Sequence, residues 1–224
     1  VIQVIKHTQR AIVMGMGSVI DSILPNLIAR GIPEAIAKRR KEGLLCIYIP
    51  KPTWDYQTKG LSLKDMLLVM ERSIQNSTGN KNFRIEDIIS LLVIPLVPAQ
   101  VKEDYNQTVL KEKKKYLNQK GLELLDKAQQ HIDVKKDIGE KCRIFTNEVI
   151  PIFEDQSNYN AQTLKELNVD RTLKISKIVP GPILEVGEED LRFLEERGIE
   201  IIELKDPRAF MMWEGKLNYN PDII

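Results

Sequence analysis

A short glycine loop near the amino terminus carries residue types that can hold an anion. Gly15 and Gly17 follow an apolar run, and Ser18 and Ser22 come after them. Glycines between a strand and a helix let backbone N–H groups approach an anion, and hydroxyls add donors. The spacing is neither GxGxxG nor a P-loop, and a structural turn would use glycines in the same way, so both interpretations stay open. Asp21 counts against phosphate, because a carboxylate repels phosphate unless a metal ion or water intervenes.

A second candidate segment is the long, aromatic loop from Pro50 to Gly60. Its side chains offer stacking faces, polar contacts and a cation: Trp54, Tyr56, Asp55, Gln57 and Lys59. It follows an apolar strand, and open parallel sheets bind ligands at the carboxyl ends of their strands. The alternative is a surface loop whose aromatic side chains pack on the fold.

The elements that must position both loops alternate along the chain. Apolar runs predict strands at 11–14, 44–49, 88–94 and 199–204, and periodic patterns predict helices at 23–29, 34–42, from Ser62 onward and at 188–197. Pro25 and Pro33 suit first helical turns, and Ser62 with Asp65 is a helix-start signal. Strands that alternate with helices indicate an α/β fold: a Rossmann-like, three-layer parallel sheet with crossover helices.

The character of the chain changes after residue 103. Residues 109–130 predict a charged amphipathic helix whose lysines 111, 113, 114 and 115 either face solvent or touch phosphates. Residues 143–153 resemble a strand, and 156–170 are polar and predict a loop. We therefore expect a Rossmann-like portion at 1–103, a helical and irregular insert at 104–170, and a C-terminal α/β portion at 171–224 that completes the same domain.

Composition excludes several classes of function. The 224 residues carry 33 Lys+Arg against 32 Asp+Glu, a net charge of +1, which argues against a nucleic-acid partner. Two Cys and two His, far apart in sequence, match no metal motif or disulfide scaffold and favour the cytoplasm. The longest apolar run, 88–97, falls short of the roughly 20 residues that a bilayer requires, so no membrane partner is expected.

Two stretches of sequence resemble a known family. Residues 11–36 read AIVMGMGSVIDSILPNLIARGIPEAI, and the register continues through residues 44–67. The pattern is similar to the CofD/YvcK family of 2-phospho-L-lactate transferases and gluconeogenesis factors. There a strand leads into a GPGSLYTS-type loop, an ILPNLLV helix and GI-x-EAI. A second strand then leads into an N-x-MTQPGETDG-type loop and a helix that opens with S-x-x-DH. The resemblance is good over residues 11–75.

The chain departs from the family pattern at several site positions. Met16 replaces the loop proline, Asp21 a threonine, Pro50 an asparagine, Gln57 a glutamate and Met66 the histidine of the DH pair. The family's N-terminal GGTG strand-loop is not in this chain, which begins at Val1. The resemblance therefore implies the later part of a larger Rossmann-like domain, with part of its site missing and part rewritten.

The resemblance also implies a ligand and a set of residues that would hold it. The ligand is a nucleotide sugar or nucleotide diphosphate, and the functional class is a regulatory binding protein rather than an enzyme. The residues carried over are Gly15, Gly17, Ser18, Ser22, Asn26, Thr53, Gln57, Thr58 and Gly60. One alternative is a transferase that moves a phospholactyl group from a guanylylated donor to a deazaflavin alcohol, with Mg²⁺ assisting the diphosphate. Another is a degenerate interaction subunit, and members of the family commonly form homodimers.

Overall fold

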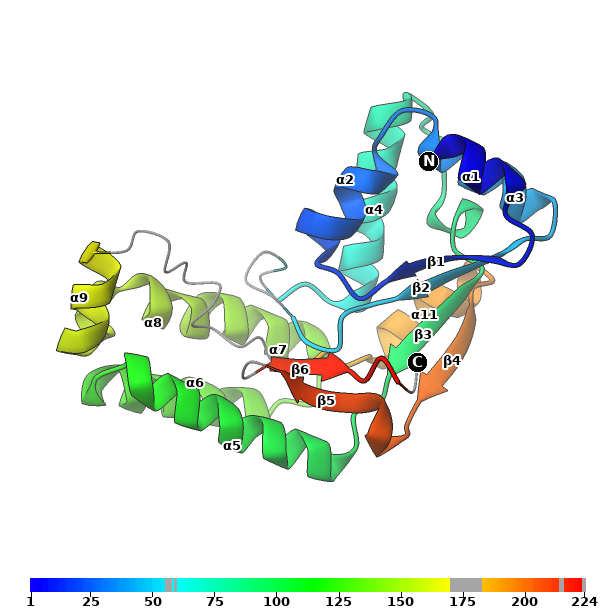
Figure 1. The fold of residues 1–224 in the computed structure, drawn as a ribbon. Helices are drawn as coiled ribbons and strands as arrows, with labels where there is room; N and C mark the ends of the chain where they lie inside the picture. Colours follow the sequence, from blue (N-terminus) through cyan, green and yellow to red (C-terminus); the bar gives the residue numbers. More distant parts are fainter. Residues whose placement is uncertain (55–57, 59, 170–182, 214–215, 223–224) are drawn as a thin grey trace. The chain divides into compact units, whose positions relative to one another are not determined.

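Four parallel strands organise the part of the chain that contains the glycine loop. The structure, a computed structural model, describes residues 1–54, 58, 60–169, 183–213 and 216–222 (Figure 1). The chain divides into two units, each treated separately below. Unit 1 consists of Val1–Pro52, Ser62–Leu96 and Glu185–Lys205, and unit 2 of Thr53–Leu61, Val97–Leu184 and Asp206–Ile224.

The sheet of unit 1 is parallel throughout and follows the order of the sequence. Its strands are β1 (Ala11–Gly15), β2 (Leu45–Ile49), β3 (Leu91–Pro95) and β4 (Glu200–Leu204), hydrogen-bonded in the order β1-β2-β3-β4. All four strands fall on the predicted apolar runs, with β3 starting three residues later than expected. The strands and the helices between them confirm the predicted α/β, Rossmann-like class.

The helices of unit 1 lie before its first strand and between its strands. They are α1 (Ile2–His7), the π-helix η1 (Val19–Ile23), α2 (Leu24–Leu27), α3 (Ile32–Lys41), α4 (Leu63–Thr78), the 3-10 turn η2 (Ile85–Asp87) and α11 (Glu188–Glu196). A capping box between Ser62 and Asp65 starts α4, as predicted. Gly43 follows α3 with φ 91°, a conformation that glycine adopts without strain.

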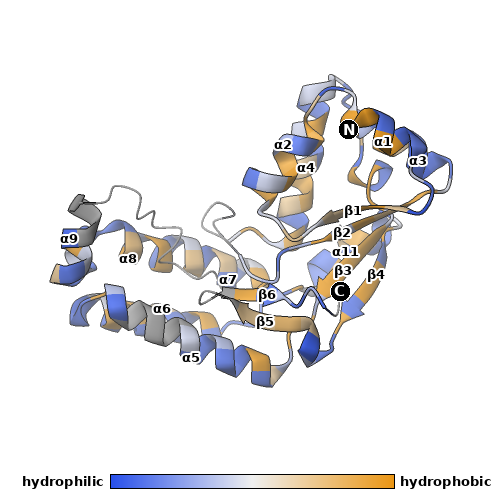
Figure 2. Ribbon diagram, in the orientation of Figure 1, coloured by the Kyte–Doolittle hydropathy of each residue, from blue (hydrophilic) through white to orange (hydrophobic). Residues whose placement is uncertain are grey.

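The two faces of the sheet differ in how well they are covered. Figure 1 shows α1, α2, α3 and α4 together on one side of the sheet. Right-handed crossovers between strands added in one direction place their helices on one face. On β2, Cys46 and Tyr48 are completely buried, whereas Leu45 at the start of that strand is 40% exposed. Val13, which neighbours buried Met14 and points to the opposite face, is 58% exposed. Figure 2 shows that the strands are largely apolar.

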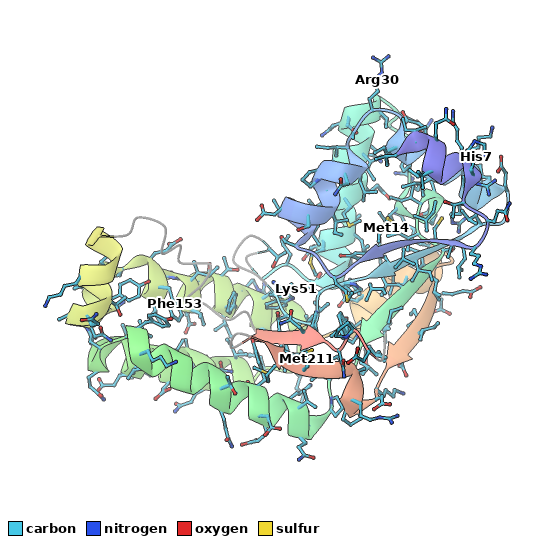
Figure 3. The ribbon with its side chains drawn as sticks, viewed as in Figure 1. His7, Met14, Arg30, Lys51, Phe153 and Met211 are labelled. Carbon is cyan, nitrogen blue, oxygen red and sulfur yellow. The ribbon has the colours of Figure 1, made fainter. Side chains whose placement is uncertain are left out.

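Unit 2 is mainly helical. It contains α5 (Ala99–Tyr116), α6 (Gln119–Asp133), α7 (Ile138–Ile144), the π-helix η3 (Phe145–Val149), α8 (Ile150–Glu154), the 3-10 turn η4 (Gln156–Asn158) and α9 (Ala161–Val169). After a short turn, η5 (Pro207–Ala209), strands β5 (Phe210–Trp213) and β6 (Lys216–Tyr219) form an antiparallel hairpin. Phe153, labelled in Figure 3, is among the fully buried residues of this unit.

Three sequence predictions for this region are wrong. The expected strand at 143–153 is helical, because its buried residues Phe145, Val149 and Ile152 recur at spacings of three and four. The expected loop at 156–170 contains η4 and α9. The expected single helix at 109–130 is two helices. Asn118 separates them and caps the second, since its side chain accepts a hydrogen bond from the Gly121 N–H.

Within the described residues, no helix has both the length and the apolar character of a membrane span.

Candidate functional site

The glycine loop lies at the carboxyl end of β1, where parallel sheets bind ligands. Met16, directly after the strand, has φ 56°, a left-handed conformation that is strained for a residue with a side chain. Two backbone bonds hold the turn: Met16 N–H donates to Ile49 O at 2.9 Å, and Gly17 N–H donates to Gly15 O at 2.8 Å. The chain therefore reverses sharply from the sheet into the following helix.

Gly17 is needed for close packing inside this loop. A Cβ atom at Gly17 would lie 2.5 Å from Ser22 Cβ and 3.0 Å from Ser22 Oγ. A Cβ at Gly15 would meet only ordinary contacts, the nearest at 3.8 Å. The two glycines of the loop therefore differ: one permits a close approach of the helix, and the other has room for a side chain.

The predicted polar residues of the loop share one helical face. Ser18, Ser22 and Asn26 follow at intervals of four, and hydrogen bonds join them along the chain. Ser22 N–H donates to Ser18 O at 2.9 Å, and Asn26 Nδ2 donates to Ser22 O at 2.6 Å. The side chains of Ser22 and Asn26 are exposed, and so is that of Asp21. The structure thus brings all five predicted residues of this loop together, in unit 1.

The π-helical turn η1 is the feature that sequence reasoning missed here. Ser18 O accepts from both Ser22 N–H and Ile23 N–H, and Ser18 Oγ caps the turn by accepting from Asp21 N–H at 3.4 Å. Residues 18–23 combine Ser and Asp with the β-branched residues Val and Ile and give no periodic signal for such a turn. Single π-turns are frequent at functional sites.

From Thr53 onward the second predicted loop belongs to unit 2, and its residues Thr53, Trp54, Thr58 and Gly60 are buried. Thr53 is 5% exposed and bridges Ile183, while Thr58 is 3% exposed. Trp54 is 5% exposed and packs edge-on against Phe145, with ring centroids 5.8 Å apart. Gln57 lies outside the described residues. Ligand contact by Thr53, Thr58 and Gly60 stays a prediction.

Gly60 fixes this loop against α7. Its φ is 73°, and a Cβ atom there would lie 2.8 Å from Cys142 O and 3.0 Å from Thr146 Oγ1. Glycine is therefore required both for the backbone conformation and for the close approach. Trp54 Nε1 has no hydrogen-bond partner within the described part of the chain.

The start of α4 in unit 1 is linked to α11 by a buried carboxylate that sequence reasoning missed. Asp190 is 2% exposed and accepts from the N–H groups of Lys64 and Gly187, at 2.8 and 2.9 Å. Burial raises the pKa of Asp190, although these hydrogen bonds oppose the rise. Its place in an acidic first helical turn was visible in the sequence, but its partner 126 residues away was not.

A second buried carboxylate, Glu71 of α4, holds unit 1 together. It accepts from Ile85 N–H at 2.9 Å and pairs with Arg197 at 3.0 Å and with Arg84 at 3.4 Å. Partial burial would lower the pKa of Arg197, but hydrogen bonds and charges from Glu86 and Glu71 raise it overall. The charged groups of this cluster pair with one another, so we assign them a structural role rather than a role in ligand binding.

Among the described residues, no three His, Cys, Asp or Glu side chains are grouped closely enough to hold a metal ion. Asp21 in the glycine loop and Asp65 at the start of α4 both lie in the first turn of a helix, where each is three residues after the N-cap serine. A carboxylate near a helix amino terminus is stabilised by the helix dipole.

Comparison with known families identifies a match over the first two thirds of the chain. A family model described as 2-phospho-L-lactate transferase CofD matches residues 1–150, which include both loops. No curated protein and no solved structure matches the chain.

Proposed function

This chain belongs to the 2-phospho-L-lactate transferase CofD family, and from that premise we propose that it binds a nucleotide diphosphate or nucleotide sugar. The diphosphate lies on the glycine loop after β1, and the role of binding is regulatory. The observation that carries the proposal is the shape of that loop. A strained Met16 and a close-packed Gly17 turn the chain so that Ser18 and Ser22 follow at the carboxyl end of a parallel strand.

The phosphate contacts proposed are backbone N–H groups of the loop, the Ser18 and Ser22 hydroxyls and the Asn26 amide. Such neutral donors suit a chain of net charge +1, since no strong overall field attracts an anion. Asp21 is exposed and lies among them. A Mg²⁺ ion bound to the diphosphate would remove its repulsion for phosphate. Mg²⁺ therefore enters the proposal together with the ligand.

Isothermal titration tests the proposal directly. UDP-glucose, UDP and GDP with Mg²⁺ are the ligands, and uridine is the control that lacks phosphate. We expect saturable binding of at least one diphosphate compound and none of uridine. Absence of binding by all of them would leave the interaction-subunit interpretation in place and reject the ligand site.

A matched pair of variants locates the site. Ser22 is exposed on the proposed phosphate face, and Ser77 is exposed at the far end of α4 in the same unit. In titrations with UDP-glucose without Mg²⁺, Ser22→Asp places a carboxylate beside the phosphates and should weaken binding by about tenfold or more, because like charges a few ångströms apart repel. Ser77→Asp adds the same charge elsewhere and should leave the affinity unchanged. Equal affinities in both variants would remove the ligand from this loop.

The transferase is the second candidate, and the name of the matching family model favours it. In that reaction the P–O bond between the phospholactyl group and GMP breaks, and the deazaflavin alcohol supplies the new oxygen. Release of GMP that depends on the alcohol would establish the transferase and reject a purely regulatory role. Binding without GMP release supports the regulatory proposal.

The proposed compartment is the cytoplasm. Cys46 and Cys142 are both buried, neither forms a disulfide, and burial raises the pKa of the Cys46 thiol. Free thiols are typical of reducing compartments.

A further inference from the structure

The turn at Met16 is held in a conformation that few residues with a side chain adopt. Its φ is 56°, and in the described part of the chain every other residue with a positive φ is a glycine. The Gly17 N–H donates to Gly15 O at 2.8 Å across this residue. A bond of this kind around a positive φ closes the rare and strained form of the γ-turn. A different conformation at Met16 would therefore release strain.

A second conformation of this turn is open to the chain. In the family pattern GPGSLYTS the position of Met16 is a proline, whose ring fixes φ at about −65°. A chain with that proline cannot close the γ-turn described here. Methionine adopts a negative φ without strain, so Met16 can take either form. We call the form with the Gly17 N–H bonded to Gly15 O closed, and the form with a negative φ and that bond broken open.

Many backbone donors of the glycine loop already have acceptors within the chain. They are the N–H groups of Met16, Gly17, Asp21, Ser22 and Ile23. The Met16 bond holds the end of β1 to β2, and the bonds of Ser22 and Ile23 belong to η1. The Asp21 N–H lies beside its own carboxylate, which repels an anion. The Gly17 N–H is thus the donor whose release relieves strain and disrupts neither the sheet nor the helix.

Gly17 lies against one of the hydroxyls that the proposed function assigns to phosphate. A Cβ atom on Gly17 would be 3.0 Å from Ser22 Oγ and 2.5 Å from Ser22 Cβ. Ser18, which carries the second of these hydroxyls, follows Gly17 directly in the chain. An N–H group freed at Gly17 would therefore join the donors proposed for the diphosphate. Backbone N–H groups gathered in a glycine loop are typical anion ligands.

We propose that the turn at Met16 is a switch that the ligand opens. The turn is closed in the free chain, and on binding the Gly17 N–H leaves Gly15 O and donates to a phosphate oxygen. Met16 is then a positioning residue, because its left-handed strain offsets part of the cost of opening and so raises the affinity. This inference rests on the proposed function, since it concerns the same diphosphate in the same loop.

Three substitutions of Met16 test the switch in titrations with UDP-glucose, UDP and GDP in the presence of Mg²⁺. Met16→Gly removes the strain of the closed form, so opening costs more and binding should weaken about fivefold. Met16→Ala keeps a Cβ atom and therefore the strain, and its affinity should match that of the parent chain. Met16→Pro cannot close, and it should bind at least as tightly as the parent chain.

Two measurements follow the turn itself. In urea without ligand, the unfolding equilibrium constant of Met16→Gly should be smaller than that of Met16→Ala by about threefold or more, because only glycine is unstrained at a positive φ. In ¹⁵N-labelled parent chain, the Gly17 amide resonance should shift downfield and saturate as the diphosphate is added. Circular dichroism checks that each variant is folded, and the glycine and alanine variants decide the outcome if Met16→Pro is not.

The possible failures are distinguishable. If Met16→Gly and Met16→Ala bind a diphosphate with equal affinity, the switch is overturned and the proposed ligand site stands. Equal stability of these two variants would show that the turn is not strained, with the same consequence. A folded Met16→Pro that binds more weakly than the parent chain would make the closed turn the binding form, contrary to the proposal. Absence of binding of all three diphosphates to the parent chain would reject the proposed function and the switch together.

Discussion

Gly17→Ala is the substitution that most directly tests the geometry of the glycine loop. The new Cβ atom would lie 2.5 Å from Ser22 Cβ, about 1 Å closer than carbon atoms pack without repulsion. Gly17 is not left-handed, so the backbone itself accepts alanine, which alone would stabilise by about 0.5 kcal/mol. Overpacking of this size costs about 1–3 kcal/mol. We therefore expect Gly17→Ala to lower the free energy of unfolding of unit 1 by about 1–2 kcal/mol.

A double-mutant cycle separates this contact from other effects. Ser22→Gly removes the atom that clashes, at a cost of about 1 kcal/mol for glycine in a helix. In the double variant the two changes should cost less than their sum by about 1–2 kcal/mol. Both tryptophans, Trp54 and Trp213, belong to unit 2, so the assay is hydrogen exchange of unit 1 amides, or circular dichroism, in urea. Additive costs would show that Gly17 and Ser22 do not touch, and the loop geometry would be rejected.

Three further predictions concern the buried groups that support the candidate loops, each measured as a free energy of unfolding in urea. Gly60→Ala should cost about 2–4 kcal/mol, because Gly60 has a left-handed backbone and the new Cβ would also clash with a backbone carbonyl. Gly79→Ala is the control: Gly79 is also left-handed but faces open space, so this variant should cost about 1 kcal/mol. Glu71→Ala should cost about 2–3 kcal/mol, because it leaves the buried Ile85 N–H and the partly exposed Arg197 without their acceptor. Arg84→Ala, whose side chain is 49% exposed, should cost under about 1 kcal/mol, and equal costs would contradict the buried network. Burial holds the pKa of Asp190 above the unfolded value of about 3.9, so the folded chain binds the proton more tightly than the unfolded chain does. The free energy of unfolding should therefore fall as the pH rises from about 4 through the folded pKa. The Asp190→Asn variant should lack this pH-dependent component.

The sheet of unit 1 could be predicted because its signals are local. Strands buried on at least one side read as apolar runs, and the connecting helices carry caps within three residues of their starts, as Ser62 and Asp65 do. Strand β3 was predicted three residues early because Ile88 and Ile89 are completely buried in the preceding turn and extend the apolar run. Burial, rather than strand pairing, explains their composition.

The helices of unit 2 could not be predicted with the same success. Residues 143–153 are rich in Ile, Val and Phe, and β-branched residues favour strands on average. Tertiary packing overrides that preference, since Phe145, Val149 and Phe153 are buried at intervals of four. The break between α5 and α6 depends on contacts with Asn158, which accepts from Asn118 N–H at 2.8 Å across 40 residues of sequence. No local pattern carries that contact.

Packing alone requires glycine in both candidate loops, whether or not a ligand binds. Gly17 admits Ser22, and Gly60 admits the carbonyl of Cys142, so either residue would be retained for packing in a chain that binds nothing. Loss of binding on substitution of either glycine would therefore follow equally from a collapsed loop and from a lost phosphate contact. Ser22→Asp separates the two, because Ser22 is exposed and the substitution adds charge without adding a Cβ to the packed turn. A loss of affinity that grows as ionic strength falls would identify repulsion of a bound anion, since Coulomb repulsion is screened by salt and steric distortion is not.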